Sequence, residues 1–306
     1  LTLKLLSKLS LLSLSLLTAF TIALPAGTYA DAVEGETVVT LGKDLTLQQQ
    51  DSILAEMKVP SNVNKIYVTN QEEHQYLGKY MSAATIGTRA LSSAKITIAA
   101  SGSGISVKTN NITTITDAMY ANAAITAGVR DADIYVTAPI RVSGTAGLTG
   151  IIKAFEQATG KQISENQKQV ANQEIVRTQD VAKDIGGDSK AAGDKAAQFM
   201  NSVKQQIADQ KPQTPQEYRD IIVNVAGDLN INLNQTTVNQ LVQYGQAFST
   251  LDINYDQLSD QISKLRGSLS NVLSVDPQGI IDNILEFLGN IFSAIGNFFT
   301  SSSSRQ

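Results

Sequence analysis

The pattern of hydrophobic and polar positions divides the chain into two halves. As far as residue 160, short runs with strand-like alternation are interspersed with helical patterns. Beyond it, apolar positions recur every three or four residues, as in helices. We therefore expect an α+β protein: an N-terminal two-layer α/β sandwich with a β-hairpin, followed by an all-helical C-terminal half.

The hairpin is predicted from two alternating runs that lie close together in the sequence. Ile96 and Ile98 alternate with polar residues, and Ile105 and Val107 do the same. The segment 101–104, Ser-Gly-Ser-Gly, separates the two runs, and its glycines permit the positive φ of a tight turn. We expect the two runs to pair directly, with one face in the core.

Hydroxyl side chains followed by acids or amides mark the predicted helix starts. Thr46 with Gln49 and Thr214 with Glu217 form capping-box patterns. Thr114 is the expected cap of an alanine-rich helix that stops near Gly128.

The domain boundaries follow from composition. We expect a signal peptide (1–30), an α+β domain (31–160), a polar connector of long, exposed helices (161–211), a helical bundle (212–300) and a disordered tail (301–306). The bundle ends in an amphipathic helix from Pro277 to Phe299. Its polar face carries two acids and no base, so burial is favoured over contact with an anionic membrane, which stays an alternative.

The N-terminal segment has the pattern of an export signal. Lys4 and Lys8 precede an apolar run from Leu11 to Leu24, and the segment ends in a small residue, Ala30. This order predicts a secretory signal peptide cleaved after Ala30, and a secreted or cell-envelope protein. An uncleaved membrane anchor is the alternative.

Composition excludes several classes of function. The chain has no cysteine and a single histidine, so thiol catalysis, disulfides, Cys-ligated zinc and histidine-based triads are excluded. We expect no metal and no cofactor. Without residues 1–30 there are 22 basic and 28 acidic residues, which argues against nucleic acid as a partner. His74 lies in a polar helix, and we interpret it as a solvated residue without a partner.

Two segments rich in glycine, hydroxyl groups and arginine are the candidate site. Arginine offers a planar fork to carboxylate or phosphate, and Ser143 to Gly150 opens a helix whose N–H groups can hold an anion. The predicted anion-binding residues are Thr88, Arg89, Arg141, Ser143, Gly144 and Thr145. Alternatively, Arg89 pairs with Asp117 or Asp133.

The glycines of the second segment recur at every third position. Gly144, Gly147 and Gly150 match neither the dinucleotide fingerprint nor the P-loop. We favour the interpretation that these glycines, continued by Ala154, form a smooth helix face for close packing on the sheet.

Several further motifs occur in a fixed order along the chain. They are Val39-Thr40-Leu41-Gly42, Val68-Thr69-Asn70, Glu73-His74, Ile86-Gly87-Thr88-Arg89-Ala90-Leu91-Ser92-Ser93-Ala94, Met119-Tyr120-Ala121-Asn122-Ala123 and Val142-Ser143-Gly144-Thr145-Ala146. These motifs resemble those of the domain of unknown function 1002 family, and the resemblance implies an exported protein of a Gram-positive bacterium and no particular activity.

The leading hypothesis for function is a non-enzymatic binding or interaction protein at or outside the cell envelope. Its partner would be an unknown protein or envelope component, and no residue is assigned a catalytic role. The alternative is a serine-dependent hydrolase that uses Ser92, Ser93 or Ser143 near Arg89 or Arg141.

Overall fold

The computed structural model describes residues 33–60, 62–187 and 189–270. The predicted signal peptide, the predicted amphipathic helix from Pro277 to Phe299 and the predicted tail lie outside these residues. Within the described part, none of the helices combines the length and the apolar composition that crossing a membrane requires.

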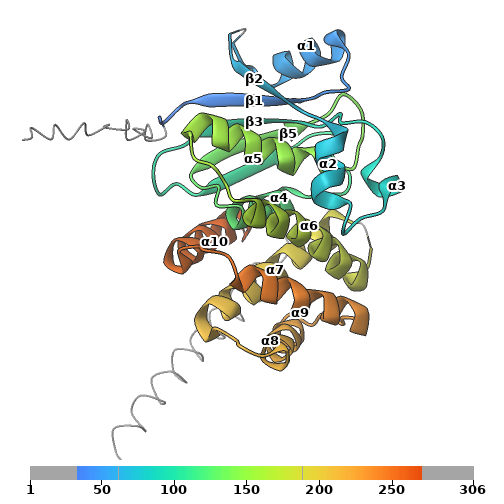
Figure 1. The fold of residues 1–306 in the computed structure, drawn as a ribbon, viewed down its shortest axis with the longest axis vertical. Coiled ribbons are helices and arrows are strands. Elements are labelled where there is room, and N and C mark those ends of the chain that lie inside the picture. The colour runs from blue at the N-terminus through green and yellow to red at the C-terminus, as the bar shows by residue number, and fades with distance from the viewer. Residues whose placement is uncertain (1–32, 61, 188, 271–306) are drawn as a thin grey trace, which may run out of the picture.

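The N-terminal half contains a mixed five-stranded sheet (Figure 1). Its strands are β1 (Thr37–Gly42), β2 (Asn64–Val68), β3 (Ser93–Ile98), β4 (Ile105–Thr109) and β5 (Ala132–Thr137). Their order across the sheet is β2-β1-β3-β5-β4. The β1–β2 and β4–β5 pairs are parallel, whereas β3 is antiparallel to both β1 and β5.

The predicted β-hairpin is wrong, although both of its strands exist. β5 lies between β3 and β4, so that Ile96 of β3 is paired with Ile134 of β5, and Val107 of β4 is paired with Ile134 from the other side. The connection from β3 to β4 therefore crosses the end of β5. Ile134 is itself buried in this central position. The alternating pattern indicates which residues face the core and leaves the partner of each strand undetermined.

Helices cover the two faces of the sheet unequally. The helices of this half are α1 (Leu47–Glu56), α2 (Asn70–Leu77), α3 (Ala83–Ile86), α4 (Asp117–Thr126) and α5 (Thr145–Thr159). Val38 packs in the core formed with α4 and α5, whereas its neighbour Val39 packs with Ile53 and Met57 at α1 on the opposite face. This opposition is the two-residue alternation of a strand.

Most helix starts agree with the capping patterns. The Thr46–Gln49 capping box precedes α1. The expected cap at Thr114 is wrong, because Thr116 accepts the N–H of Met119 and α4 begins at Asp117.

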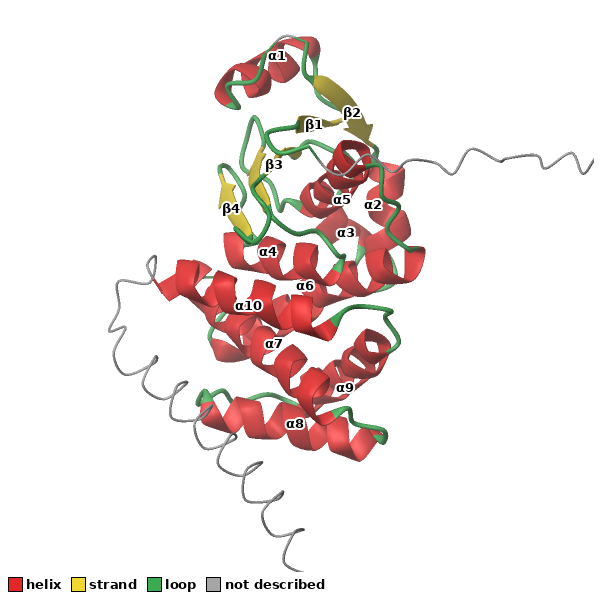
Figure 2. Ribbon diagram, turned by 90° about the vertical axis from the view of Figure 1, so that its left-hand side faces the viewer, coloured by secondary structure: helices red, strands yellow, loops and turns green. Residues whose placement is uncertain are grey.

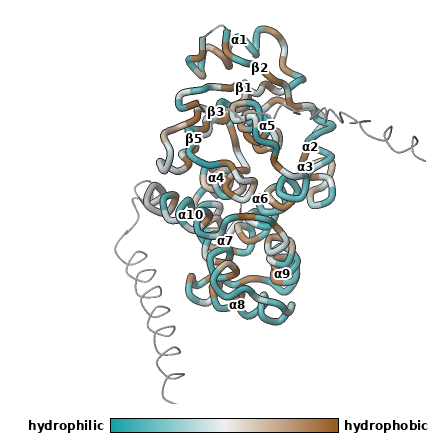
Figure 3. Tube along the Cα trace, turned by 60° about the vertical axis from the view of Figure 1, so that its left-hand side comes forward, coloured by the Kyte–Doolittle hydropathy of each residue, from teal (hydrophilic) through white to brown (hydrophobic). Residues whose placement is uncertain are grey.

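The C-terminal half is all-helical, and the α+β prediction is confirmed. Its helices are α6 (Glu165–Ile185), α7 (Lys190–Gln210), α8 (Pro215–Asp228), α9 (Gln235–Ser249) and α10 (Tyr255–Ser270). The Thr214–Glu217 capping box precedes α8 as expected. Figure 2 shows these helices stacked beneath the sheet, with α4 and α6 at the junction. Brown and teal positions alternate along α8 and α9 in Figure 3, as in amphipathic helices.

The expectation that residues 161–211 form exposed helices is wrong. One hydrophobic core runs from the sheet through α6 and α7 to α10. Some of the buried polar residues in these helices are paired: Lys204 Nζ lies 2.8 Å from Glu174 Oε1, and Thr126 and Tyr244 donate to Glu174 Oε2. Others, such as Asn201, are buried without a side-chain hydrogen bond. Composition alone could not distinguish such a network from a solvated surface.

Candidate functional site

A pocket of about 340 Å³ brings the two arginine-containing segments together. It lies where α2, the end of α3 and the following loop meet the start of α5. Of the predicted anion-binding residues, Thr88, Arg89, Ser143, Gly144 and Thr145 line it, and Arg141 does not. The binding role of these residues stays a prediction.

Arg89 lines this pocket, and its side chain is not committed to another group. The side chain is exposed and makes no hydrogen bond or ion pair with any described residue. The alternative partner Asp117 instead accepts from Thr109 (2.7 Å) and lies 3.5 Å from Lys190. The guanidinium is therefore available to an external anion.

The start of α5 contributes uncapped N–H groups. Gly144 is the N-cap residue, at a φ of 97° that favours glycine, and no side chain caps the helix. Tyr120, buried on α4, donates to the Gly144 carbonyl (2.5 Å) and so fixes the position of this helix start. The positive end of the helix dipole faces the pocket lining.

The glycines of α5 pack closely, but within this pattern only Gly150 packs on the sheet as expected, whereas Gly147 packs on α4. A Cβ atom at Gly147 would overlap the side chain of Tyr120, and one at Gly150 would overlap the hydroxyl of Thr40 on β1. Ala154, further along this helix, is fully buried.

The loop after α3 is held by side chains from α2. Gly87, with a φ of 86°, ends α3, and its carbonyl accepts from the Asn70 amide at 3.3 Å. His74 Nε2 lies 3.0 Å from the same carbonyl. The prediction that His74 is solvated and unpartnered is therefore wrong; it is half-buried and helps to position the loop.

Glu73 is the pocket residue that the sequence analysis missed. Its side chain is 1% exposed, and Oε2 accepts from the Thr145 hydroxyl at 2.5 Å. Oε1 is buried without a hydrogen-bond partner; the nearby Asn70 amide donates instead to Gly87. A signal was present, because Glu73 shares a helix face with Leu77, four residues on, which is buried.

Burial controls the ionisation of Glu73. It raises the pKa of this carboxyl to about 7, outweighing the Thr145 hydroxyl, the nearby Asn70 amide and His74, which lower it; the negative charge of Asp44 also raises it. Near neutral pH, both the protonated and the ionised forms are accessible.

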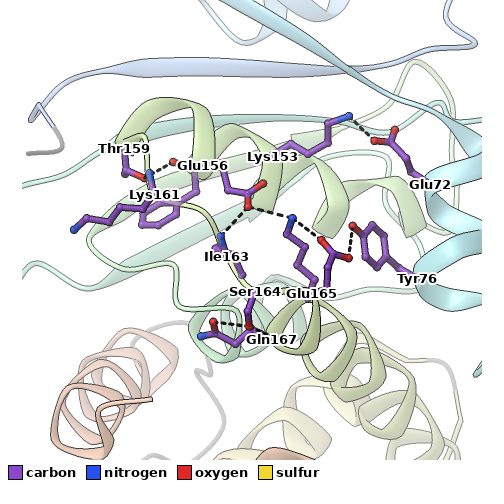
Figure 4. Close-up of polar contacts among 12 residues, drawn as sticks. Glu72, Tyr76, Lys153, Glu156, Thr159, Lys161, Ile163, Ser164, Glu165 and Gln167 are labelled. Atoms are coloured by element: carbon purple, nitrogen blue, oxygen red, sulfur yellow. Dashed lines mark hydrogen bonds and ion pairs between the residues drawn. The ribbon is translucent and has the colours of Figure 1, made fainter. Parts of the chain in front are cut away.

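The helix that carries Glu73, α2, is also bonded to α5 and α6 through other side chains. Figure 4 shows Lys153 of α5 pointing toward Glu72 of α2, at 2.6 Å, and Tyr76 of α2 bonded to Glu165 of α6, at 3.2 Å. These contacts join α2, α5 and α6 into one support for the pocket.

The three candidate serines differ in position. Ser92 and Ser143 line the pocket, whereas Ser93 accepts the Gly42 N–H with its hydroxyl and is turned toward β1. Ser143 Oγ lies 3.5 Å from Thr145 Oγ1. Among the described residues, no group of three His, Cys, Asp or Glu side chains is arranged to hold a metal ion.

Comparison with known proteins places the chain in a family. No solved structure matches it. It is 44% identical over 279 residues to "Uncharacterized protein YpuA" of Bacillus subtilis (strain 168), covering 90% of this chain and 93% of that protein. A family model, "Protein of unknown function (DUF1002)", matches residues 41–265, which include both pocket segments. The chain therefore belongs to the DUF1002 family.

Proposed function

We propose that this protein is an exported binding protein that takes a small anionic ligand in the pocket between α2 and α5. The observation that carries the proposal is that Arg89 lines the pocket beside the uncapped start of α5 and has no acidic partner among the described residues. The N–H donors of an arginine guanidinium group and of a helix N-terminus can bind the oxygen atoms of a carboxylate or a phosphate.

The remaining features of the pocket are compatible with a small anion. Its volume lies near the lower end of the range for small-molecule sites, roughly 300–1,000 Å³. The hydroxyls of Thr88, Ser92 and Ser143 supply neutral donors. Glu73 would repel an anion when ionised, but its pKa of about 7 keeps a neutral form accessible.

Arg89 and Arg141 make a matched pair for testing this proposal. Both side chains are exposed and unpaired among the described residues, and only Arg89 lines the pocket. We expect propionate or inorganic phosphate to bind the full chain, Arg89→Ala to weaken binding about tenfold or more, and Arg141→Ala to change it little. Titration calorimetry measures this, and equal effects of the two substitutions would contradict the assignment.

Export is supported by the basic start, the apolar run and the small residues that end at Ala30. We expect the protein to be recovered outside the cytoplasmic membrane with Asp31 as its first residue. Amino-terminal sequencing of the recovered protein checks this, and an intact N-terminus would favour the uncleaved anchor.

A serine-dependent hydrolase is the second candidate. It is favoured by one observation: Ser143 approaches Thr145, which donates to Glu73, so a proton could pass from Ser143 toward a carboxylate. A fluorophosphonate probe separates the two candidates, because covalent labelling of Ser143 would support hydrolysis and an unlabelled chain would support binding alone.

A further inference from the structure

The pocket leaves one group of each charge sign unsatisfied. Glu73 Oε1 is buried without a hydrogen-bond partner, and Arg89 has no acidic partner among the described residues. Both side chains line the same pocket, yet no ion pair joins them. A buried polar atom without a partner costs free energy, and a ligand that supplied the missing donor would recover it.

We propose that the ligand is a small zwitterion of the α-amino acid type, with its carboxylate at Arg89 and the start of α5, and its ammonium group at Glu73 Oε1. This inference rests on the anion-binding function proposed above and names the class of ligand. A free α-amino acid carries an ammonium and a carboxylate group on the same carbon atom, whereas an internal residue of a peptide carries neither charge.

The surroundings of Glu73 favour a cationic donor over a neutral one. Asp44 adds negative charge near this carboxyl, and among the described residues no lysine or arginine forms an ion pair with it. Thr145 from α5 already satisfies Oε2, and His74 beside it is engaged with the Gly87 carbonyl. An ammonium group would compensate the buried charge as well as donate to Oε1.

The lining of the pocket also contains aliphatic side chains. Ile86, Leu91 and Val142 line it together with the charged and hydroxyl groups. A short aliphatic side chain of the ligand would pack against these residues, so alanine is a suitable probe.

The test uses four ligands of similar size that differ only in their polar groups. Alanine has a carboxylate and an ammonium group, lactate a carboxylate and a hydroxyl, propionate a carboxylate alone, and ethylamine an ammonium group alone. Calorimetric titration of the full chain at pH 8, where Glu73 is largely ionised, should show alanine binding at least about tenfold more tightly than propionate, lactate or ethylamine.

Substitution of Glu73 tests whether this carboxylate causes the preference for alanine over propionate. Glu73→Gln should abolish the preference for alanine over propionate. Propionate should bind at least as tightly as to the wild type, because the repelling charge is gone, which also shows that the variant is folded. Glu34→Gln is the control with the same chemical change, because Glu34 is exposed, makes no side-chain hydrogen bond or ion pair with a described residue and does not line the pocket. It should keep the preference for alanine.

The pH dependence of ligand binding gives an independent test of the role of Glu73. Burial raises the pKa of Glu73 to about 7, in the presence of Asp44, His74 and the Thr145 hydroxyl, and Tyr120 of α4 is also close enough to sense its charge. The preference for alanine over propionate should therefore increase as the pH rises from 6 to 8.

The outcomes separate the two proposals. Propionate and alanine binding equally well, lactate binding best, or Glu73→Gln leaving the preference for alanine unchanged would each overturn the zwitterion and leave the anion site standing. Failure of all the carboxylates and of phosphate to bind would overturn both.

Discussion

Glu73 shows how a single residue can combine functional and energetic roles. It is a nearly fully buried acid on an eight-residue helix, and the part of the chain around it reads as polar. Arg89 and Ser143 could be predicted because glycine-rich segments with arginine indicate loops at sites. For Glu73 the spacing to Leu77 indicated only a shared helix face. Its place in the pocket could not be predicted, because that depends on α5, which lies about seventy residues later and brings Thr145 against it.

The raised pKa of Glu73 makes a prediction about stability. Its folded value is about 7, compared with an ordinary 4.5, so the folded state binds more protons between these values. The contribution of this group to stability is complete below pH 4.5 and is lost as the pH rises through 7. We expect Glu73→Gln to be about 3 kcal/mol more stable than the wild type at pH 8, with little difference at pH 4.5.

Urea unfolding at both pH values measures this difference in the free energy of unfolding. Glu34→Gln, an exposed position before β1, is the control and should show no such change with pH. A constant difference between Glu73→Gln and the wild type across this range would contradict the burial of an ionisable carboxyl.

The elements differ in how far local sequence determines them. The capping boxes of α1 and α8 are local signals, and both were predicted correctly. The insertion of β5 between β3 and β4 is non-local, because alternating runs indicate that strands exist but not which strands pair. The packed face of α5 is also indicated by a local signal, the spacing of its glycines.

The packing of α5 predicts opposite outcomes for two helical glycines. Gly147→Ala should destabilise the protein by about 1–3 kcal/mol, because the methyl group would overlap Tyr120, which is fully buried and bonded to Gly144. Gly227→Ala in α8 meets open space and should stabilise it by about 0.5–1 kcal/mol through helix propensity. Thermal or urea unfolding distinguishes them, and a stabilised Gly147→Ala would show that α5 is loosely packed.

At the scale of the whole molecule, the helical half supports the half that carries the site. α6 and α7 pack on α4 around Glu174 and Lys204, while α4 provides Tyr120 to the start of α5. The sequence indicated a helical half, but its polar composition concealed that these helices share a core with the sheet. Charged side chains can be buried when they are paired. The sequence does not show that Glu174 and Lys204, which lie on different helices, form such a pair.

Binding of a small anion through Arg89 and the start of α5 can be observed residue by residue. Backbone amide chemical shifts are measured by NMR while propionate is added to the full chain. We expect saturable changes concentrated in residues 86–92 and 143–147, and their loss in Arg89→Ala. Unchanged spectra, or changes confined to other parts of the chain, would contradict it.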